Sequence, residues 1–285
     1  MAIAWLIAAV LAAAGAADEP ELRQVSPGAW VLIGTSGNVL IVPAPEGTLI
    51  IDDERASDHD EIVAAVAKVS PMPVRTVIDT HWHADHSGGN EAFARAGAAI
   101  VAQREVRVRM NTDQFMPAYN RTVPAAPPIA LPSRVYDDTL DLRAGGEAVA
   151  LHHAPRAHTD GDTIVRLEHA NVIHMGDVYF NGIWPFIDRA SGGSVQGVIA
   201  GVDAALAMAD AKTVIVPAHG NLATRADLAR YRTMLAEVAE RVRKAIAAGQ
   251  TVEQATASKP AAAWRDGMEG DEDRFVAAVY ESLKG

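Results

Sequence analysis

The chain has 285 residues, of which 49% are hydrophobic and 21% charged, a composition typical of a globular protein with a sizeable core. Its net charge is −11 and it has no long basic run, which argues against nucleic acid or an anionic membrane as the main partner. The absence of cysteine excludes disulfides, iron–sulfur clusters and thiol nucleophiles, so any zinc ion would need histidine and carboxylate ligands.

Residues 1–17 form an apolar run that ends in small residues. This pattern is typical of a secretory signal peptide, although the run is not preceded by lysine or arginine. We therefore predict a cleaved signal peptide over 1–17, one domain over 18–285, and a periplasmic or secreted protein without stable membrane association after cleavage. An uncleaved anchor and a buried helix are the alternatives, and the run is slightly short for the roughly 20 residues that span a bilayer.

The first part of the mature chain is predicted to be rich in β-structure. Short apolar runs separated by glycine, proline and asparagine indicate strands, and apolar residues at helical spacing indicate two helices. The expected strands cover residues 30–33, 39–42, 48–52, 74–79 and 98–102, and the expected helices cover 58–69 and 90–96. The hairpin tip at 34–38 is glycine-rich, and we expect it to be flexible and able to overhang a functional site.

Residues 111–132 interrupt this pattern because they contain five prolines. We expect no regular structure in this segment. A long irregular segment in a compact domain is often a lid or a binding loop, and a plain surface linker is the alternative.

The second part again alternates strands and helices. The expected strands cover residues 148–152, 163–167, 171–175 and 213–217, and the expected helices cover 194–209, 225–248 and 273–283. Two β-rich halves that each carry helices favour an α+β fold with two facing sheets and helices outside.

The most informative segment follows the predicted strand at 74–79. It places His81, His83, Asp85 and His86 within six residues, and Gly88-Gly89 then allows a sharp turn. Several imidazoles and a carboxylate on one tight loop suit two borderline-soft divalent cations better than one. A chance cluster of surface histidines is the alternative, which is disfavoured because the rest of the chain offers further ligands.

Three further candidate ligands, His158, Asp177 and His219, each come soon after a predicted strand. The order H-x-H-x-D-H, then His, then Gly-Asp, then His, resembles the metallo-β-lactamase superfamily from about residue 21 to the C-terminus. The resemblance implies a four-layer αβ/βα sandwich with two zinc ions at one edge of the sheets. It implies that the first zinc is held by His81, His83 and His158, the second by Asp85, His86 and His219, and that Asp177 bridges both.

The resemblance also implies the reaction, which is hydrolysis of a small-molecule substrate by a hydroxide that bridges two metals. Asp85 would orient this hydroxide or carry its proton, in addition to binding zinc. The expected substrate is an ester, thioester, lactone or amide. A β-lactam is possible, although Asp177 and Phe180 stand where one lactamase subclass has a cysteine ligand and a substrate-binding lysine. The alternatives are an iron-dependent sulfur dioxygenase-type oxidoreductase and a metal-stabilised binding protein without turnover.

Other residues near these motifs have two interpretations each. Asp160 and Asp162 either hydrogen-bond a ligand imidazole or cap their own loop. His174 is expected in the core or behind a ligand, and His152 or His153 could line the pocket. His59 is expected on a helix surface and His169 in a turn.

Specificity is expected to come from loops. Trp184 and Phe186 either form an apolar pocket wall or pack in the core. Arg104, Arg109 and Arg121 lie near the proline-rich segment and either bind a substrate carboxylate or are surface charges.

Overall fold

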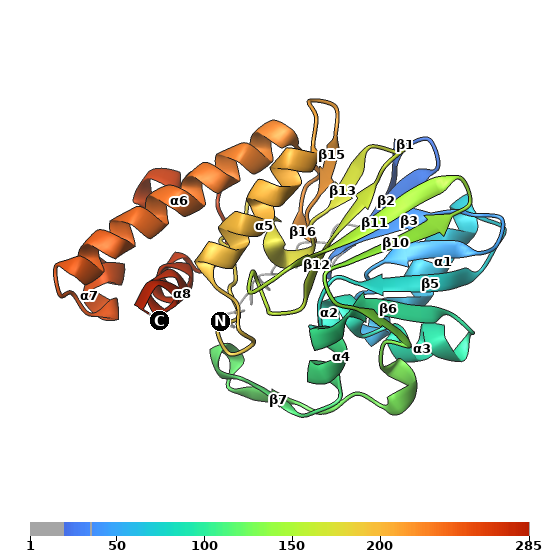
Figure 1. Cartoon of the computed structure of the whole chain (residues 1–285), viewed down its shortest axis with the longest axis horizontal. Coiled ribbons are helices and arrows are strands. Elements are labelled where there is room, and N and C mark those ends of the chain that lie inside the picture. The colour runs from blue at the N-terminus through green and yellow to red at the C-terminus, as the bar shows by residue number, and fades with distance from the viewer. Residues whose placement is uncertain (1–19, 35, 285) are drawn as a thin grey trace, which may run out of the picture.

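Two β-sheets face each other and helices cover their outer faces (Figure 1). The computed structural model describes residues 20–34 and 36–284, so the predicted signal peptide at 1–17 lies outside the described residues. Within the described residues, every helix is too short or too polar to cross a membrane. The two facing sheets with helices on their outer faces form the αβ/βα sandwich that the sequence predicts.

The first sheet has seven strands in the order β1-β2-β3-β4-β5-β6-β9. Strands β1 to β4 pair antiparallel, and β4, β5, β6 and β9 pair parallel. The strands are β1 Glu21–Ser26, β2 Ala29–Ile33, β3 Asn38–Val42, β4 Thr48–Ile51, β5 Val74–Asp79, β6 Ala99–Gln103 and β9 Arg134–Tyr136.

The second sheet has six strands in the order β10-β11-β12-β13-β15-β17. Its one parallel pair joins β13 to β15. The strands are β10 Thr139–Ala144, β11 Glu147–Ala154, β12 Asp162–Leu167, β13 Val172–His174, β15 Val214–Val216 and β17 Ala223–Thr224. Two small pairs complete the β-structure: β14 Phe180–Asn181 with β16 His219–Gly220, and β7 Gln114–Met116 with β8 Arg121–Val123.

The helices lie mainly outside the sheets, and α6, α7 and α8 extend to one side of the sandwich in Figure 1. The α-helices are α1 His59–Val69, α2 Ala84–Ser87, α3 Asn90–Arg95, α4 Arg104–Met110, α5 Val195–Met208, α6 Arg225–Ala247, α7 Val252–Ala257 and α8 Glu272–Lys284. Single turns of 3-10 helix occur at η1 Ala56–Asp58, η2 Pro117–Tyr119, η3 Pro128–Ala130, η4 Gly176–Val178 and η5 Ala262–Trp264.

The layers follow from the two-residue period of the strands. Along β3, Val39 and Ile41 pack in the cluster shared with α1, whereas Leu40 and Val42 pack in the cluster between the two sheets. Because successive side chains point to opposite faces, a strand covered on both faces is apolar at every position. The outer face of the second sheet packs against α5, α6 and α8 in a third cluster.

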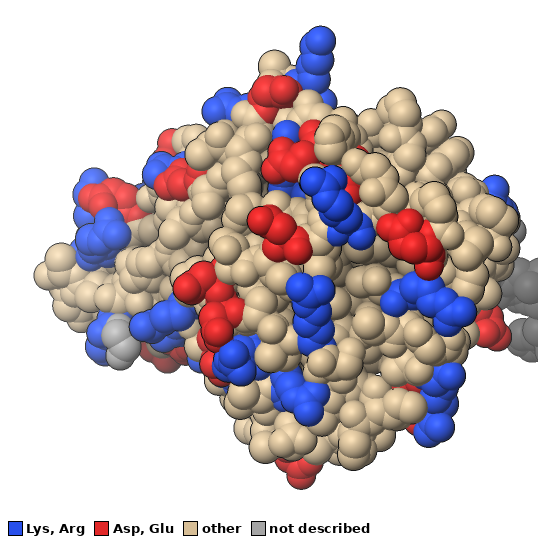
Figure 2. All heavy atoms as spheres, turned by 45° about the vertical axis from the view of Figure 1, so that its right-hand side comes forward, with Lys and Arg blue, Asp and Glu red and all other residues tan. Residues whose placement is uncertain are grey.

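The surface carries both signs of charge. Figure 2 shows acidic and basic side chains interspersed among wide uncharged areas on one face of the molecule.

The prediction that residues 111–132 contain no regular structure is wrong. They form the β7–β8 hairpin and two turns of 3-10 helix, and the hairpin lies at the bottom of Figure 1. The prolines are compatible with this structure because Pro117 and Pro128 each stand at the first position of a 3-10 turn, where the missing N–H is not needed. Strand β10 and helices α4 and α7 were not anticipated either.

Candidate metal centre

Five loops meet at one edge of the sandwich, where strands β4, β5, β11, β13 and β15 end. All seven predicted ligands lie in the segments that follow β5, β11, β13 and β15, including α2 and β16, and they form two adjacent clusters that could each hold a metal ion. The first cluster contains His81, His83, His158 and Asp177, and the second contains Asp85, His86 and His219. Within each cluster the ligand atoms all lie within 4.8 Å of one another.

The first cluster is compact and buried. His83 Nδ1 lies 3.0 Å from His81 Nε2 and 2.9 Å from His158 Nε2. Asp177 Oδ2 lies 3.3 Å from His158 Nε2 and 3.8 Å from His81 Nε2. Four potential ligand atoms therefore surround one small space.

The second cluster lies on the other side of Asp177. Asp85 Oδ2 is 3.8 Å from His86 Nε2 and 3.7 Å from His219 Nε2. The second carboxylate oxygen of Asp177, Oδ1, is 3.5 Å from His86 Nε2 and 3.3 Å from His219 Nε2. The two oxygens of Asp177 thus face different clusters, as expected of a bridging carboxylate.

Close backbone packing places Asp177 at this point. Gly176 has a φ of 51°, and a Cβ built on it would lie 2.8 Å from Cβ of Thr80. Only glycine therefore allows the β13 loop to approach the loop after β5. On the opposite side, the side-chain amide of Asn38 donates to the carbonyls of Pro217 and Gly220 and holds the His219 loop. The described part of the hairpin tip at 34–38 thus supports this loop and is not among the residues that line the site cavity.

Asp52 was missed as a functional residue by the sequence analysis. Its Oδ2 is 2.9 Å from Nδ1 of His86 and accepts a hydrogen bond from the Thr80 hydroxyl, while its Oδ1 accepts one from the Thr80 N–H. Its φ of 62° is unusual for a residue other than glycine and is typical of strain at a functional site. The sequence contains a signal for Asp52, because this residue ends the predicted strand at 48–52, and the next predicted strand, at 74–79, leads into the metal loop.

Asp188 was also missed, and no motif marks it. Its Oδ2 lies 3.0 Å from Nε2 of His83 and accepts from the hydroxyl of Ser191 at 2.5 Å. Burial raises the pKa of Asp188, but the hydrogen bonds from His83 and Ser191 outweigh burial and hold the pKa below its usual range. An ionised carboxylate behind a ligand imidazole fixes the ring's orientation and increases its basicity.

Two more rings are held by neighbouring oxygens. His158 donates from Nδ1 to the carbonyl of Phe186 at 2.7 Å, and Nδ1 of His81 lies 3.2 Å from the hydroxyl of Thr80. Each of these contacts leaves the other ring nitrogen, Nε2, to face the cluster.

The electrostatics of the two clusters differ. Burial lowers the pKa of His158 to about 4, and burial together with the neighbouring imidazoles lowers the pKa of His81 well below its usual value. Burial also lowers the pKa of His86, but Asp177, Asp85 and Asp52 outweigh it and raise this pKa to about 10. Burial raises the pKa of Asp177, and the surrounding imidazoles reverse this effect and bring it to about 2. The imidazoles of His81 and His158 are therefore neutral near pH 7, whereas the carboxylates around His86 favour a positive charge on its ring.

The remaining candidates have mainly structural roles. Asp162 accepts from the N–H and hydroxyl of Thr159, so it caps its own loop. Asp160 forms a bidentate ion pair with Arg109, at 2.6 and 2.7 Å. His174 is fully buried and bonds the backbone of Asn38, as expected for a core residue.

A cavity of about 920 Å³ opens over the clusters. Neither His152 nor His153 is among its lining residues. The lining comprises Arg55, Ala56, Ser57, Trp82, His83, Ala84, Asp85, Gly88, Met116, Tyr119, Arg121, Val123, Asp177, Phe180, Ile183, Phe186 and His219.

The aromatic candidates divide between this cavity and the core. Phe186 lines the cavity, whereas Trp184 is buried and stacks on Phe275 with ring centroids 5.7 Å apart. Phe180 stacks on the ring of His219, with centroids 5.6 Å apart and planes 13° from parallel. The wall beside the second cluster is therefore apolar, and the cavity lining contains no lysine among the residues that the structure describes.

The sequence matches the Metallo-beta-lactamase superfamily over residues 24–219. It is similar to hydroxyacylglutathione hydrolases, with 31% identity over 128 residues to the protein of Polaromonas sp. and 27% over 115 residues to that of Erythrobacter litoralis. These matches cover 42% and 40% of this chain and 45% and 38% of the relatives. A linear primary-alkylsulfatase of Pseudomonas sp. is 35% identical over 69 residues, which are 24% of this chain and 13% of that protein. The chain thus matches less than half the length of these curated relatives.

Solved structures have the same fold. A metallo-beta-lactamase from Pontibacter korlensis superimposes with a TM-score of 0.61 and 18% identity over 76% of this chain and 99% of its own. A stereoselective inverting sec-alkylsulfatase from Pseudomonas sp. gives a TM-score of 0.69 and 16% identity over 92% of this chain and 50% of its own.

Proposed function

The chain belongs to the metallo-beta-lactamase superfamily, and we propose that it is an exported di-zinc hydrolase that cleaves an ester, thioester, lactone or amide, a class that includes the β-lactams. The observation that carries this proposal is the pair of adjacent His/Asp clusters with one oxygen of Asp177 facing each. The proposal of export rests on the sequence of residues 1–17 alone.

Two unsatisfied buried atoms support metal binding. Nε2 of His86 and Oδ1 of Asp177 are buried and have no hydrogen-bond partner within the described residues. Leaving such atoms unpaired costs about 1–3 kcal/mol each, so a missing partner is expected at this point. A cation between them would satisfy both.

The spacing of the ligand atoms also fits zinc. Ligands about 2.0–2.1 Å from a tetrahedral zinc ion lie about 3.3 Å from one another. The first cluster brings together Nε2 of His81, Nδ1 of His83, Nε2 of His158 and Oδ2 of Asp177. Distances between these atoms include 2.9, 3.0, 3.3 and 3.8 Å. Imidazole and carboxylate without thiolate is a donor set that zinc accepts.

When bound, two zinc ions would polarise the bond to be cleaved and lower the pKa of water to near neutrality. The chain itself supplies the group that accepts the proton and orients the water. Asp85 lines the cavity and its side chain is 31% exposed. Burial raises the pKa of Asp85, but the His86 and His219 imidazoles lower it below the usual value, so Asp85 is ionised and its carboxylate can accept a proton from water.

The hydrolase assignment is tested with purified, zinc-loaded protein and a panel of a hydroxyacylglutathione thioester, a lactone, a 4-nitrophenyl ester and a chromogenic cephalosporin. We expect turnover of at least one compound with a kcat/KM of roughly 10⁴ M⁻¹s⁻¹ or more, abolished by a chelator and restored by zinc. Absence of chelator-sensitive turnover across the panel would contradict the proposal.

A second candidate is hydrolysis of sulfate esters. Two observations favour it: the identity of 35% to a linear primary-alkylsulfatase over 69 residues, and the superposition of a sec-alkylsulfatase over 92% of this chain, which exceeds the 76% covered by a metallo-beta-lactamase. Release of sulfate from octyl sulfate, with no turnover of carboxylic esters, would favour this candidate over the first.

The iron-dependent sulfur dioxygenase alternative predicts a different composition and a different reaction. Protein purified without added metal would contain iron and would consume oxygen in the presence of a persulfide. Zinc as the main metal, without oxygen consumption, would support the hydrolase.

A further inference from the structure

We propose that the substrate carries an anionic group separate from the bond that is cleaved, and that Arg121 and Arg55 bind this group at the mouth of the site cavity. The inference rests on the proposed hydrolase function, which it deepens by naming the chemical class of the substrate. That class is an anionic ester or thioester with an apolar part, the anion being a carboxylate, sulfonate or phosphate.

The three arginines near the proline-rich segment have different environments. Arg104 forms a bidentate ion pair with Asp137, and Arg109 forms one with Asp160, so both are already neutralised. Arg121 forms no ion pair within 4 Å in the part of the chain that the structure describes, and it lines the cavity. Of the three, Arg121 is therefore the guanidinium available to a ligand.

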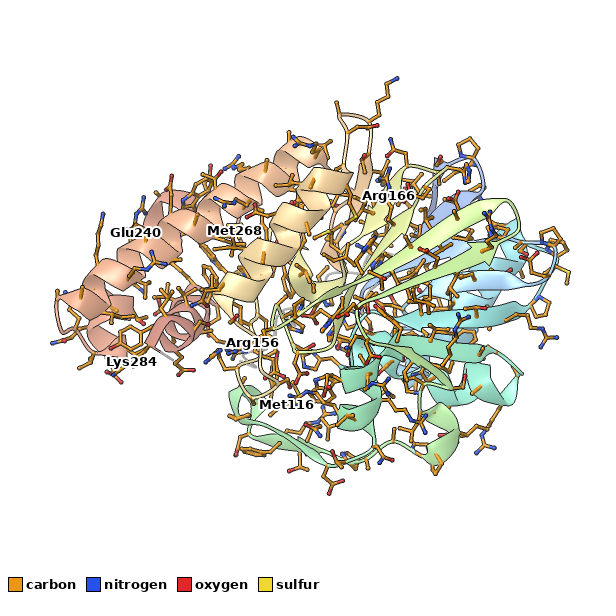
Figure 3. All side chains as sticks on the ribbon, in the orientation of Figure 1. Met116, Arg156, Arg166, Glu240, Met268 and Lys284 are labelled. Carbon is orange, nitrogen blue, oxygen red and sulfur yellow. The ribbon has the colours of Figure 1, made fainter. Side chains whose placement is uncertain are left out.

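The β7–β8 hairpin holds Arg121 in place. Arg121 begins β8 and pairs with Met116 on β7, a residue labelled in Figure 3. The side chain of Met116 packs against the cluster around Trp82. At the hairpin tip, the ring of Tyr119 lies between Phe186, at 5.6 Å between centroids, and the guanidinium of Arg274, at 5.4 Å. The contacts of Met116 and Tyr119, both at the turn end of the hairpin, thus hold the backbone of Arg121 beside the cavity and limit the entropy lost on binding.

Arg55 reaches the same cavity from a different element. It lies between β4 and η1, next to Glu54, and its side chain is exposed at the cavity wall. Among the described residues it too has no carboxylate partner within 4 Å. The only carboxylates that line this cavity within the described chain are Asp85 and Asp177, and both face the imidazoles of the metal clusters.

The cavity lining has three regions that differ in charge and polarity. The His/Asp clusters occupy one part of the lining, and Phe180, Ile183 and Phe186 form an apolar surface beside them. Arg55 and Arg121, which have no ion-pair partner among the described residues, give the cavity lining two positive charges in a chain of net charge −11, and an anion there gains charge-assisted hydrogen bonds. A substrate with a reactive bond at the clusters, an apolar segment on the aromatic wall and an anion at the arginines fits all three regions.

Two esters of similar length test the proposal: mono-4-nitrophenyl glutarate, which carries a carboxylate, and neutral 4-nitrophenyl valerate. For zinc-loaded wild-type protein we expect a lower KM for the anionic ester. Arg121→Gln should reduce the ratio of the two kcat/KM values about tenfold, through KM, and Arg121→Lys should restore part of it, because one charge-assisted hydrogen bond has about this value. Arg55→Gln should also reduce the ratio of the two kcat/KM values.

Binding to metal-free protein gives a readout that does not depend on turnover. Isothermal titration with hexane-1-sulfonate should show Kd rising about tenfold in Arg121→Gln, whereas Kd for 1-hexanol stays unchanged. The matched control is Arg134→Gln on β9, an exposed arginine that lines a different cavity and should change neither ligand.

The outcomes separate the two proposals. If neither ester is hydrolysed by the zinc-loaded protein, the hydrolase assignment fails for these esters, and the sulfonate titration still decides the role of the arginines. An unchanged ratio of kcat/KM, or an unchanged sulfonate Kd, in both Arg121→Gln and Arg55→Gln would overturn the anion proposal and leave the hydrolase intact.

Discussion

The two halves of the metal centre are built differently. In the first cluster, His81 and His158 are fully buried, and His81, His83 and His158 each have their second ring nitrogen held by an oxygen. In the second, the side chains of Asp85 and His219 are 31% and 21% exposed and line the cavity. Preorganised, buried ligands bind a metal tightly, whereas exposed ligands exchange more readily and meet the substrate. We therefore expect the second cluster to bind its metal more weakly.

Removing a ligand of the first cluster has the largest expected effect. His158→Ala leaves His83 without the partner 2.9 Å away and opens a space in a fully buried site. We expect the metal of this cluster to be lost and kcat/KM to fall by at least about 10³, a loss of about 4 kcal/mol of transition-state stabilisation. Metal analysis and initial rates check this, with His169→Ala, an exposed turn residue, as the control. Full activity in His158→Ala would disprove the site assignment.

Removing the bridge should affect the two clusters unequally. In Asp177→Ala, the first cluster keeps three buried imidazoles, and the second keeps the buried His86 together with Asp85 and His219, which are partly exposed. We expect close to one metal ion per chain after dialysis, with the loss mainly from the second cluster. Equal loss from both clusters, measured by spectroscopy of the cobalt-substituted protein, would contradict a bridging role.

Asp188 and Asp52 each contact a ligand imidazole, and their removal is expected to have an effect of intermediate size. Asp188→Asn should weaken metal binding at the first cluster about 10–100-fold, and Asp52→Asn should do the same at the second, because each carboxylate contacts one ligand ring. Competition with a chelator of known affinity measures both, and Asp141→Asn on the exposed side of β10 is the control. If both variants weaken the binding of the same metal ion, the two clusters are not independent and this prediction is wrong.

The last expected effect concerns stability on the side of the second cluster. Burial, followed by repulsion from Asp58 and Glu61, raises the pKa of Glu54 to about 8 from 4.5. The folded state therefore binds this proton more tightly than the unfolded state, and the stabilisation is lost as the pH rises from about 4.5 through 8. Glu54→Gln should reduce the pH dependence of the free energy of unfolding between pH 5 and 8 by about 3–4 kcal/mol.

Urea denaturation of metal-free protein at both pH values measures this effect, with Glu91→Gln on α3 as an exposed control. A pH dependence that is identical in the wild type and Glu54→Gln would show that Glu54 is ionised in the folded protein at pH 5.

Prediction from sequence succeeded where the signal is local. The strand at 74–79 and the H-x-H-x-D-H loop lie next to each other in the chain, so their geometry follows from a few residues. Asp188 could not be found in this way, because its contact with His83 joins residues 105 positions apart. The β7–β8 hairpin was missed because proline was interpreted as a breaker, although its prolines lie outside the paired positions.

The sequence by itself determined the αβ/βα layering, through apolar strands alternating with helices, and the residue types of the candidate centre, through histidine and aspartate without cysteine. The tertiary structure decided which oxygen of Asp177 faces which cluster, which carboxylate holds each ring, and that Arg121 lines the cavity while Arg104 and Arg109 are paired. The physical reason is that these relations depend on side chains from different loops, whose distances are set when the two sheets pack.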